Sequence, residues 1–135
     1  MNAKQMLKAF TKAGKRAHLV GDLDAGVIAA LDMEGRLFTV LGGEILNRVN
    51  PEAIAGQSTR ERYFIPGGDG LWPAPEGTLS GYEYSTGAWR VPSGLCAARF
   101  RMTQATKWSA SILAEVDLVN NRGLGVPTIF QRQIA

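Results

Sequence analysis

From residue 17 onward, apolar residues occur in short runs that turn residues separate. Residues 17–23, 26–32 and 36–42 form the first three runs, divided by "DAG" and "DMEGR". Short apolar runs between turn sequences are typical of β-strands, and the Asp and Gly residues between them favour tight turns. The chain has Gly 16 and Pro 6, more than the usual share, which fits many turns. These features predict an all-β chain that begins with a three-stranded meander.

Later segments also have the composition of strands. They are "RYFI", "GYEYSTGAWRV", a hairpin pair "SGLCAARFRMTQAT" and "WSASILAEVDLVN", and "VPTIFQRQI". In the second half of the hairpin, one side of the strand is apolar and holds Ile112, Ala114, Val116 and Leu118. One helical turn is predicted to begin at Pro51. The length of 135 residues is that of one domain. We therefore expect an antiparallel β-sandwich of about eight strands over residues 17–135.

Residues 1–16 have a different pattern and predict a short amphipathic helix. Asn2 and Gln5 have the spacing of a capping box, and Gly14 is placed to end the helix. Its apolar side holds Met6, Leu7 and Phe10. Such a helix either binds a membrane surface or a partner, or docks its apolar side onto the sandwich. The apolar side is narrow, which favours docking.

Charge is distributed unevenly along the chain. The net charge is +3, yet residues 1–16 hold five basic residues and no acidic one. Residues 17–135 then hold 10 basic and 12 acidic residues, a net charge of −2. A nucleic-acid-binding domain needs a basic surface on its folded body, so we expect no nucleic-acid partner. We also expect no membrane contact, because no stretch approaches the length of a transmembrane helix. No apolar run typical of a secretion signal precedes the strands, so we expect a cytoplasmic protein.

Several kinds of chemistry are not expected. With one Cys and one His, the chain cannot form an internal disulfide or a zinc site. We expect His18 to be a half-buried strand residue and Cys96 a small buried one. The "GGDG" sequence lacks the lysine and the following helix of a phosphate-binding loop. No metal and no cofactor is therefore predicted.

Residues 65–77, "IPGGDGLWPAPEG", suit neither a helix nor a paired strand. Six of the chain's aromatic residues fall within residues 63–89. An aromatic wall with a few polar groups is the usual design of a small-molecule pocket and suits a sugar. Trp72 and Trp89 either form such a wall or plug the end of the core. Glu76 with Asp69 or Glu83 is either a carboxylate pair of the glycosidase kind or a set of solvated acids.

The order of several segments resembles a known superfamily. The segments are "AALDMEGRLFTVL", "ILNR", "GGDGLWPAPEG" and "AEVDLVNNRGLGVPTIFQRQI". Together they are similar to the N-terminal half of the galactose-mutarotase-like β-supersandwich proteins, over residues 17–135. The resemblance implies a large antiparallel sandwich and a sugar-facing loop with Asp69, Trp72 and Glu76, joined by Asn47 and Arg48. The catalytic His and Glu of mutarotases lie in later segments, so no catalytic residue can be assigned. An enzyme of this kind would be an aldose epimerase or would process glycosides.

Two functions of different classes follow. The first is a carbohydrate-binding, mutarotase-like module whose ligand is a sugar or small polar molecule, bound by Asn47, Arg48, Asp69, Trp72, Glu76 and Trp89. The second is a non-enzymatic interaction protein that uses the same aromatic residues as a protein interface. The last strand carries Val126, Ile129, Phe130 and Ile134. An exposed apolar edge there predicts a two-fold dimer or completion by a C-terminal half.

Overall fold

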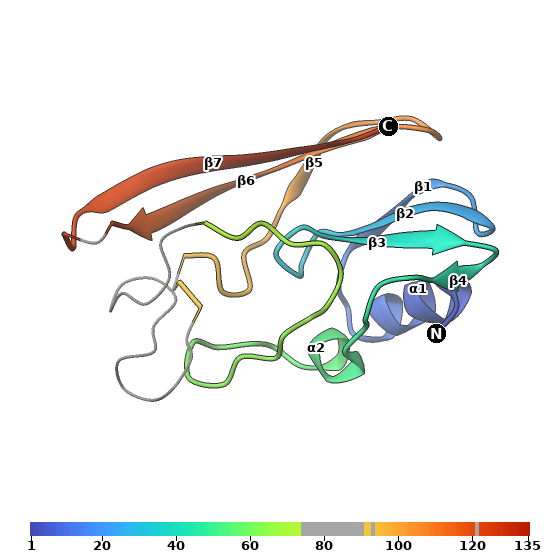
Figure 1. Ribbon diagram of the computed structural model, residues 1–135, viewed down its shortest axis with the longest axis horizontal. Helices are drawn as coiled ribbons and strands as arrows, with labels where there is room; N and C mark the ends of the chain where they lie inside the picture. Colours follow the sequence, from blue (N-terminus) through green and yellow to red (C-terminus); the bar gives the residue numbers. More distant parts are fainter. Residues whose placement is uncertain (74–90, 93, 121) are drawn as a thin grey trace.

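A computed structural model describes residues 1–73, 91–92, 94–120 and 122–135 (Figure 1). Within this part, strands form two antiparallel sheets, and a short helix lies near the N-terminus. The elements in chain order are α1 (Ala3–Lys12), β1 (Ala17–Gly21), β2 (Ala25–Ala30), β3 (Arg36–Leu41), β4 (Glu44–Ile45), α2 (Pro51–Ala55), β5 (Arg101–Ala105), β6 (Ala110–Val119) and β7 (Gly125–Ile134). The sheet orders are β1-β2-β3-β4 and β5-β6-β7.

Helix α1 confirms the capping box predicted from the sequence. Asn2 Oδ1 accepts a hydrogen bond from the Gln5 N–H at 2.8 Å, and Gln5 Oε1 accepts one from the Asn2 N–H at 3.1 Å. Past the C-terminus, Gly14 has a φ of 65°, a left-handed conformation that glycine adopts at low cost. Met6 and Phe10 are buried in the core. The helix therefore docks its apolar side onto the sheet, as its narrow apolar face predicts.

The first sheet contains the predicted meander. Ile28 of β2 pairs with Leu19 of β1 on one side and with Phe38 of β3 on the other. Strand β4 is only two residues long and pairs with the last residues of β3. Because β4 is so short, it leaves the first half of β3 without a strand neighbour on that side. The helical turn predicted at Pro51 is present as α2, capped by the Asn50 side chain.

The second sheet is built around β6. All ten of its residues pair with β7, from Ala110 opposite Ile134 to Val119 opposite Gly125. The predicted apolar side of β6 is confirmed, because Ile112, Ala114 and Val116 are buried. All residues of β5 are exposed. Among the described residues, β7 has a strand neighbour on one side only.

Helix α1, the first sheet and the second sheet lie in three layers (Figure 1). One core cluster fills the space between α1 and the first sheet and includes Ile54 of α2. The other joins the two sheets, with Ala29 and Leu31 on one side and Ile112 and Ala114 on the other. Successive residues of β2 therefore point to different cores, which explains why this strand is apolar on both sides.

Two strand predictions were wrong. Residues 62–65, "RYFI", form no strand, because their backbone bonds within their own loop: Phe64 N–H donates to Ser58 Oγ at 3.1 Å. Residues 94–97, expected to lie in a strand, form a turn in which Ala97 has a φ of 55°. Most of "GYEYSTGAWRV" lies outside the described residues. The described part thus holds seven strands, against the eight or so expected.

Candidate functional site

The glycine-rich loop lies against the open half of β3. Asp69 N–H donates to the Leu37 carbonyl at 2.8 Å, and Leu37 N–H donates to the Asp69 carbonyl at 3.0 Å. Gly68 N–H donates to the Arg48 carbonyl at 3.0 Å, and Gly67 lies opposite Val49. The loop thus occupies the edge that the short β4 leaves free. It also lies beside the "ILNR" segment through these contacts with Arg48 and Val49.

Two glycines of this loop lie in close contact with side chains of β3. A methyl group at Gly70 would lie 2.5 Å from Cζ of Arg36, and one at Gly68 would lie 2.9 Å from the Phe38 ring. Gly68 also has a φ of 67°, which favours glycine. The absence of a side chain at these positions therefore lets the loop pack closely over β3.

Asp69 holds the loop to the second sheet. The Arg132 guanidinium of β7 forms an ion pair with Asp69 Oδ2 and donates to the Asp69 carbonyl at 2.9 Å. Arg132 also donates to the Gly35 carbonyl at 3.1 Å. One carboxylate oxygen of Asp69 is therefore committed to the protein. Its side chain is otherwise exposed.

The other predicted ligand-binding residues differ in their exposure and in the bonds that they make within the protein. Asn47 Oδ1 accepts a hydrogen bond from the Thr39 N–H at 2.6 Å, which ties it to β3. Arg48 is exposed, and its side chain makes no hydrogen bond or ion pair with any described residue. Trp72 is 48% exposed. Glu76 and Trp89 lie outside the described residues, as does Glu83.

A buried polar cluster, which the sequence did not predict, lies beside this loop. Glu34 and Arg36 form an ion pair at 3.0 Å in which both side chains are almost fully buried. The Tyr63 hydroxyl donates to Glu34 Oε2 at 2.8 Å and lies 3.2 Å from Arg36 Nη2. The only trace of this cluster in the sequence is the "EGR" of residues 34–36, which we interpreted as a turn. Nothing in it indicated the partner Tyr63.

Burial and charge change the pKa values of this cluster. Burial and the nearby Glu34 carboxylate raise the pKa of the Tyr63 hydroxyl. Burial lowers the pKa of Arg36, but the attraction of Glu34 and Tyr63 and the hydrogen bonds to both together outweigh it, and the net pKa lies above its usual value. Arg36 therefore stays charged and Tyr63 neutral at physiological pH. The hydrogen bonds of Tyr63 to Glu34 and Arg36 fix the Tyr63 loop against the start of β3.

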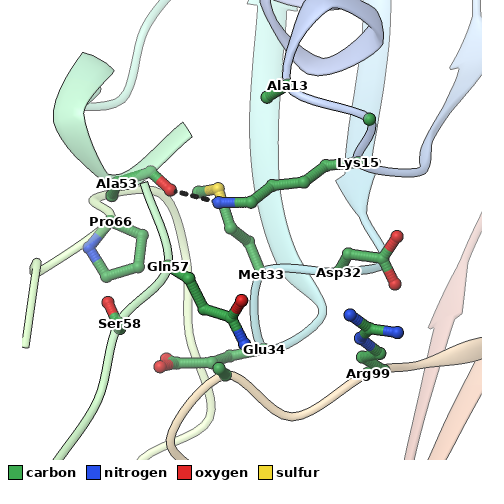
Figure 2. A pocket seen from close by; sticks show the side chains of 12 residues that line it. Ala13, Lys15, Asp32, Met33, Glu34, Ala53, Gln57, Ser58, Pro66 and Arg99 are labelled. Atoms are coloured by element: carbon green, nitrogen blue, oxygen red, sulfur yellow. Dashed lines mark hydrogen bonds between the residues drawn. The ribbon is translucent and has the colours of Figure 1, made fainter. Parts of the chain in front are cut away.

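Glu34 also lines a cavity of about 170 Å³ between the end of α1, α2 and the β2–β3 turn (Figure 2). Lys15 crosses its upper side and donates to the Ala53 carbonyl at 2.6 Å. Asp32 and Arg99 lie on one side, and Ser58 lies on the other. This cavity shares only Pro66 with the glycine-rich loop, and no sequence motif pointed to it. Its walls come from four segments of the chain.

His18 and Cys96 were predicted to be structural. His18 is half-buried on β1, as predicted, and its Nε2 atom is enclosed without a hydrogen-bond partner among the described residues. Cys96 is half-buried and packs against Val91 and Leu95. Burial raises the pKa of its thiol to about 11, so it is a weak nucleophile.

Within the described residues, no three His, Cys, Asp or Glu side chains are grouped to hold a metal ion. The described helices are all too short to cross a membrane. Comparison of the chain with protein-family models, curated proteins and solved structures finds no match. The function is therefore argued from the residues alone.

Proposed function

We propose that this protein is a carbohydrate-binding module, a β-sandwich of the galactose-mutarotase-like kind whose glycine-rich loop is the sugar platform. One observation carries the proposal: Trp72 remains 48% exposed on a loop whose backbone is bonded to β3. Tryptophan is usually mostly buried, so a half-exposed one on an anchored loop favours a binding role. An anchored loop also loses little conformational entropy when it binds.

The chemistry of the loop suits a sugar. The Trp72 indole offers an apolar face to sugar C–H groups, while polar groups nearby bind hydroxyls. Arg48 supplies hydrogen-bond donors, and its backbone is bonded to the loop at Gly68. Asp69 keeps one carboxylate oxygen that makes no hydrogen bond with a described residue. Asn47 is left out of this site, because its side-chain oxygen is bonded to β3.

Binding to a panel of mono- and oligosaccharides, measured by saturation-transfer NMR and calorimetry, tests this proposal. Trp72→Ala is expected to lower the affinity about tenfold or more, since stacking on an aromatic ring contributes on the order of 1 kcal/mol or more. Trp108→Ala is the matched control, because Trp108 is 60% exposed but lies in the β5–β6 turn. The proposal is contradicted if no sugar of the panel binds, or if the two variants lose the same sugar affinity.

A second candidate, a protein-interaction module, has its own observation. Strand β7 has a neighbour on one side only among the described residues, and Ile129 on it is 66% exposed. An open strand edge favours pairing with a second copy. Of the residues first expected at this edge, Ile134 is instead buried and Phe130 is half-buried. A substitution at either residue would therefore disturb the core as well as the edge.

Light scattering after size-exclusion chromatography tests this candidate. Wild type is expected to form a two-fold dimer, and Ile129→Lys is expected to shift it toward monomer. Gln131→Lys is the control, because Gln131 is exposed on the same strand and is already polar. Wild type that remains monomeric at high micromolar concentration contradicts the dimer.

A further inference from the structure

The cavity in Figure 2 is polar and small. Its volume of about 170 Å³ is below the range of about 300–1,000 Å³ that is usual for drug-sized ligands. Residues 13–15, 32–34 and 57–58 line it, with Ala53, Pro66, Ala97 and Arg99. The size therefore restricts a ligand to a small molecule.

One carboxylate oxygen of Glu34 accepts no hydrogen bond within the described part of the chain. Glu34 is 4% exposed, and its Oε2 atom accepts hydrogen bonds from Tyr63 and Arg36. Its Oε1 atom accepts none from any described residue. Glu34 is one of the residues that line the cavity. A hydrogen bond from a ligand hydroxyl to this carboxylate oxygen would involve a charged acceptor and would be stronger than one between neutral groups.

The charges around the cavity favour an anion. Asp32 is paired with Arg16 at 2.6 Å, and Glu34 is paired with Arg36. Lys15 and Arg99 also line the cavity, and neither forms an ion pair with a described residue. Both carboxylates that line the cavity are thus paired with arginines outside its lining, while its two lining cations, Lys15 and Arg99, have no ion-pair partner among the described residues.

Lys15 is held in place for this role. Its Nζ atom donates to the Ala53 carbonyl at 2.6 Å and to the Gly56 carbonyl, which leaves one of its three protons for a ligand. Burial lowers the pKa of this ammonium, and the Asp32 charge partly restores it. The position of the charge is therefore set before a ligand arrives.

We propose that this cavity binds a small hydroxycarboxylate. The ligand carboxylate binds Lys15 and Arg99, and a ligand hydroxyl donates to Glu34 Oε1. Of the loop that carries Trp72, only Pro66 lines this cavity, and the proposal stands whether or not that loop binds sugars.

Calorimetry with glycerate and tartrate tests the proposal. Their matched controls are propionate and succinate, which lack the hydroxyls, and glycerol, which lacks the carboxylate. We expect glycerate or tartrate to bind and to shift the amide signals of Gly14, Gln57 and Ala97. Propionate and succinate are expected to bind about tenfold more weakly or worse, because they lose a hydrogen bond to the charged Glu34. Glycerol is expected to bind at least as weakly, because it loses the contacts of the carboxylate with Lys15 and Arg99.

Arg99→Gln tests the cation, because Arg99 is exposed and its replacement leaves the core intact. It is expected to lower glycerate or tartrate affinity about tenfold, whereas Arg101→Gln, a nearby exposed arginine that does not line the cavity, is not. Trp72→Ala is expected to leave this binding unchanged. The proposal is overturned if neither hydroxycarboxylate binds, if propionate binds as tightly as glycerate, or if the two arginine variants lose affinity equally.

Discussion

The Tyr63 hydroxyl donates a hydrogen bond to Glu34 Oε2 across 2.8 Å, although the two residues are 29 positions apart. The same hydroxyl lies 3.2 Å from Arg36 Nη2. A loop residue thus completes a buried ion pair that begins in the β2–β3 turn. A hydrogen bond to a buried charge is worth more than one between neutral groups, so this contact is a sensitive point of the fold.

Tyr63→Phe is expected to lower the free energy of unfolding at pH 7 by about 2 kcal/mol, because it removes a hydrogen bond to a charged group. The pKa of Tyr63 is raised in the folded protein, so its contribution is fully present below the unfolded-state pKa of about 10. Above that pH the unfolded chain releases the proton first, and wild type loses about 1.4 kcal/mol per pH unit through this group. Urea unfolding of both proteins from pH 7 to 11.5 measures this. A gap between them that stays constant above pH 10 contradicts the prediction.

Gly70→Ala is expected to lower the free energy of unfolding by about 2 kcal/mol, the usual cost of overpacking. The added methyl group would meet the Arg36 guanidinium, which cannot move away without breaking its bonds to Glu34 and Tyr63. Gly125→Ala is the matched control, since nothing lies within 4 Å of the added group there. Thermal and urea unfolding compare the two. Equal effects would show that the close packing over Arg36 carries no cost.

His18→Leu is expected to raise the free energy of unfolding by about 1 kcal/mol. The change removes the enclosed Nε2 atom, which has no hydrogen-bond partner among the described residues, and keeps an apolar side chain of similar size. His18→Asn, which retains polar atoms at the same place, is the control and is expected to give no gain. Urea unfolding at pH 7.5 measures both. A less stable leucine variant would indicate that Nε2 has a partner in solution.

The local parts of the fold could be predicted from the sequence. The capping box of Asn2 and Gln5, the three-stranded meander and the alternating side of β6 all depend on residues close in the chain. The strand predicted at residues 62–65 failed because the backbone of this aromatic segment bonds to Ser58, a side-chain contact that periodicity does not reveal.

The site was harder to predict because its contacts join distant residues. Arg132 and Asp69 are 63 positions apart, and nothing in either local sequence indicates the other. The sequence placed Asp69 and Asn47 among ligand-binding residues, yet both have bonds within the protein. The cavity beside Glu34 collects its walls from four segments, so no single motif could reveal it.

The β6–β7 hairpin differs along its length, and this has a consequence for its motions. Ala110 and Ile134 at one end are buried in the core between the sheets, whereas Leu124 and Val126 at the other end are exposed. Backbone hydrogen bonds open more often where few apolar contacts hold them. Amide hydrogens near Val119 and Gly125 should therefore exchange with solvent through brief local fraying, while those near Ile112 exchange only when the whole molecule unfolds. A single continuous ladder would then contain both the fastest and the slowest exchanging strand amides of this sheet.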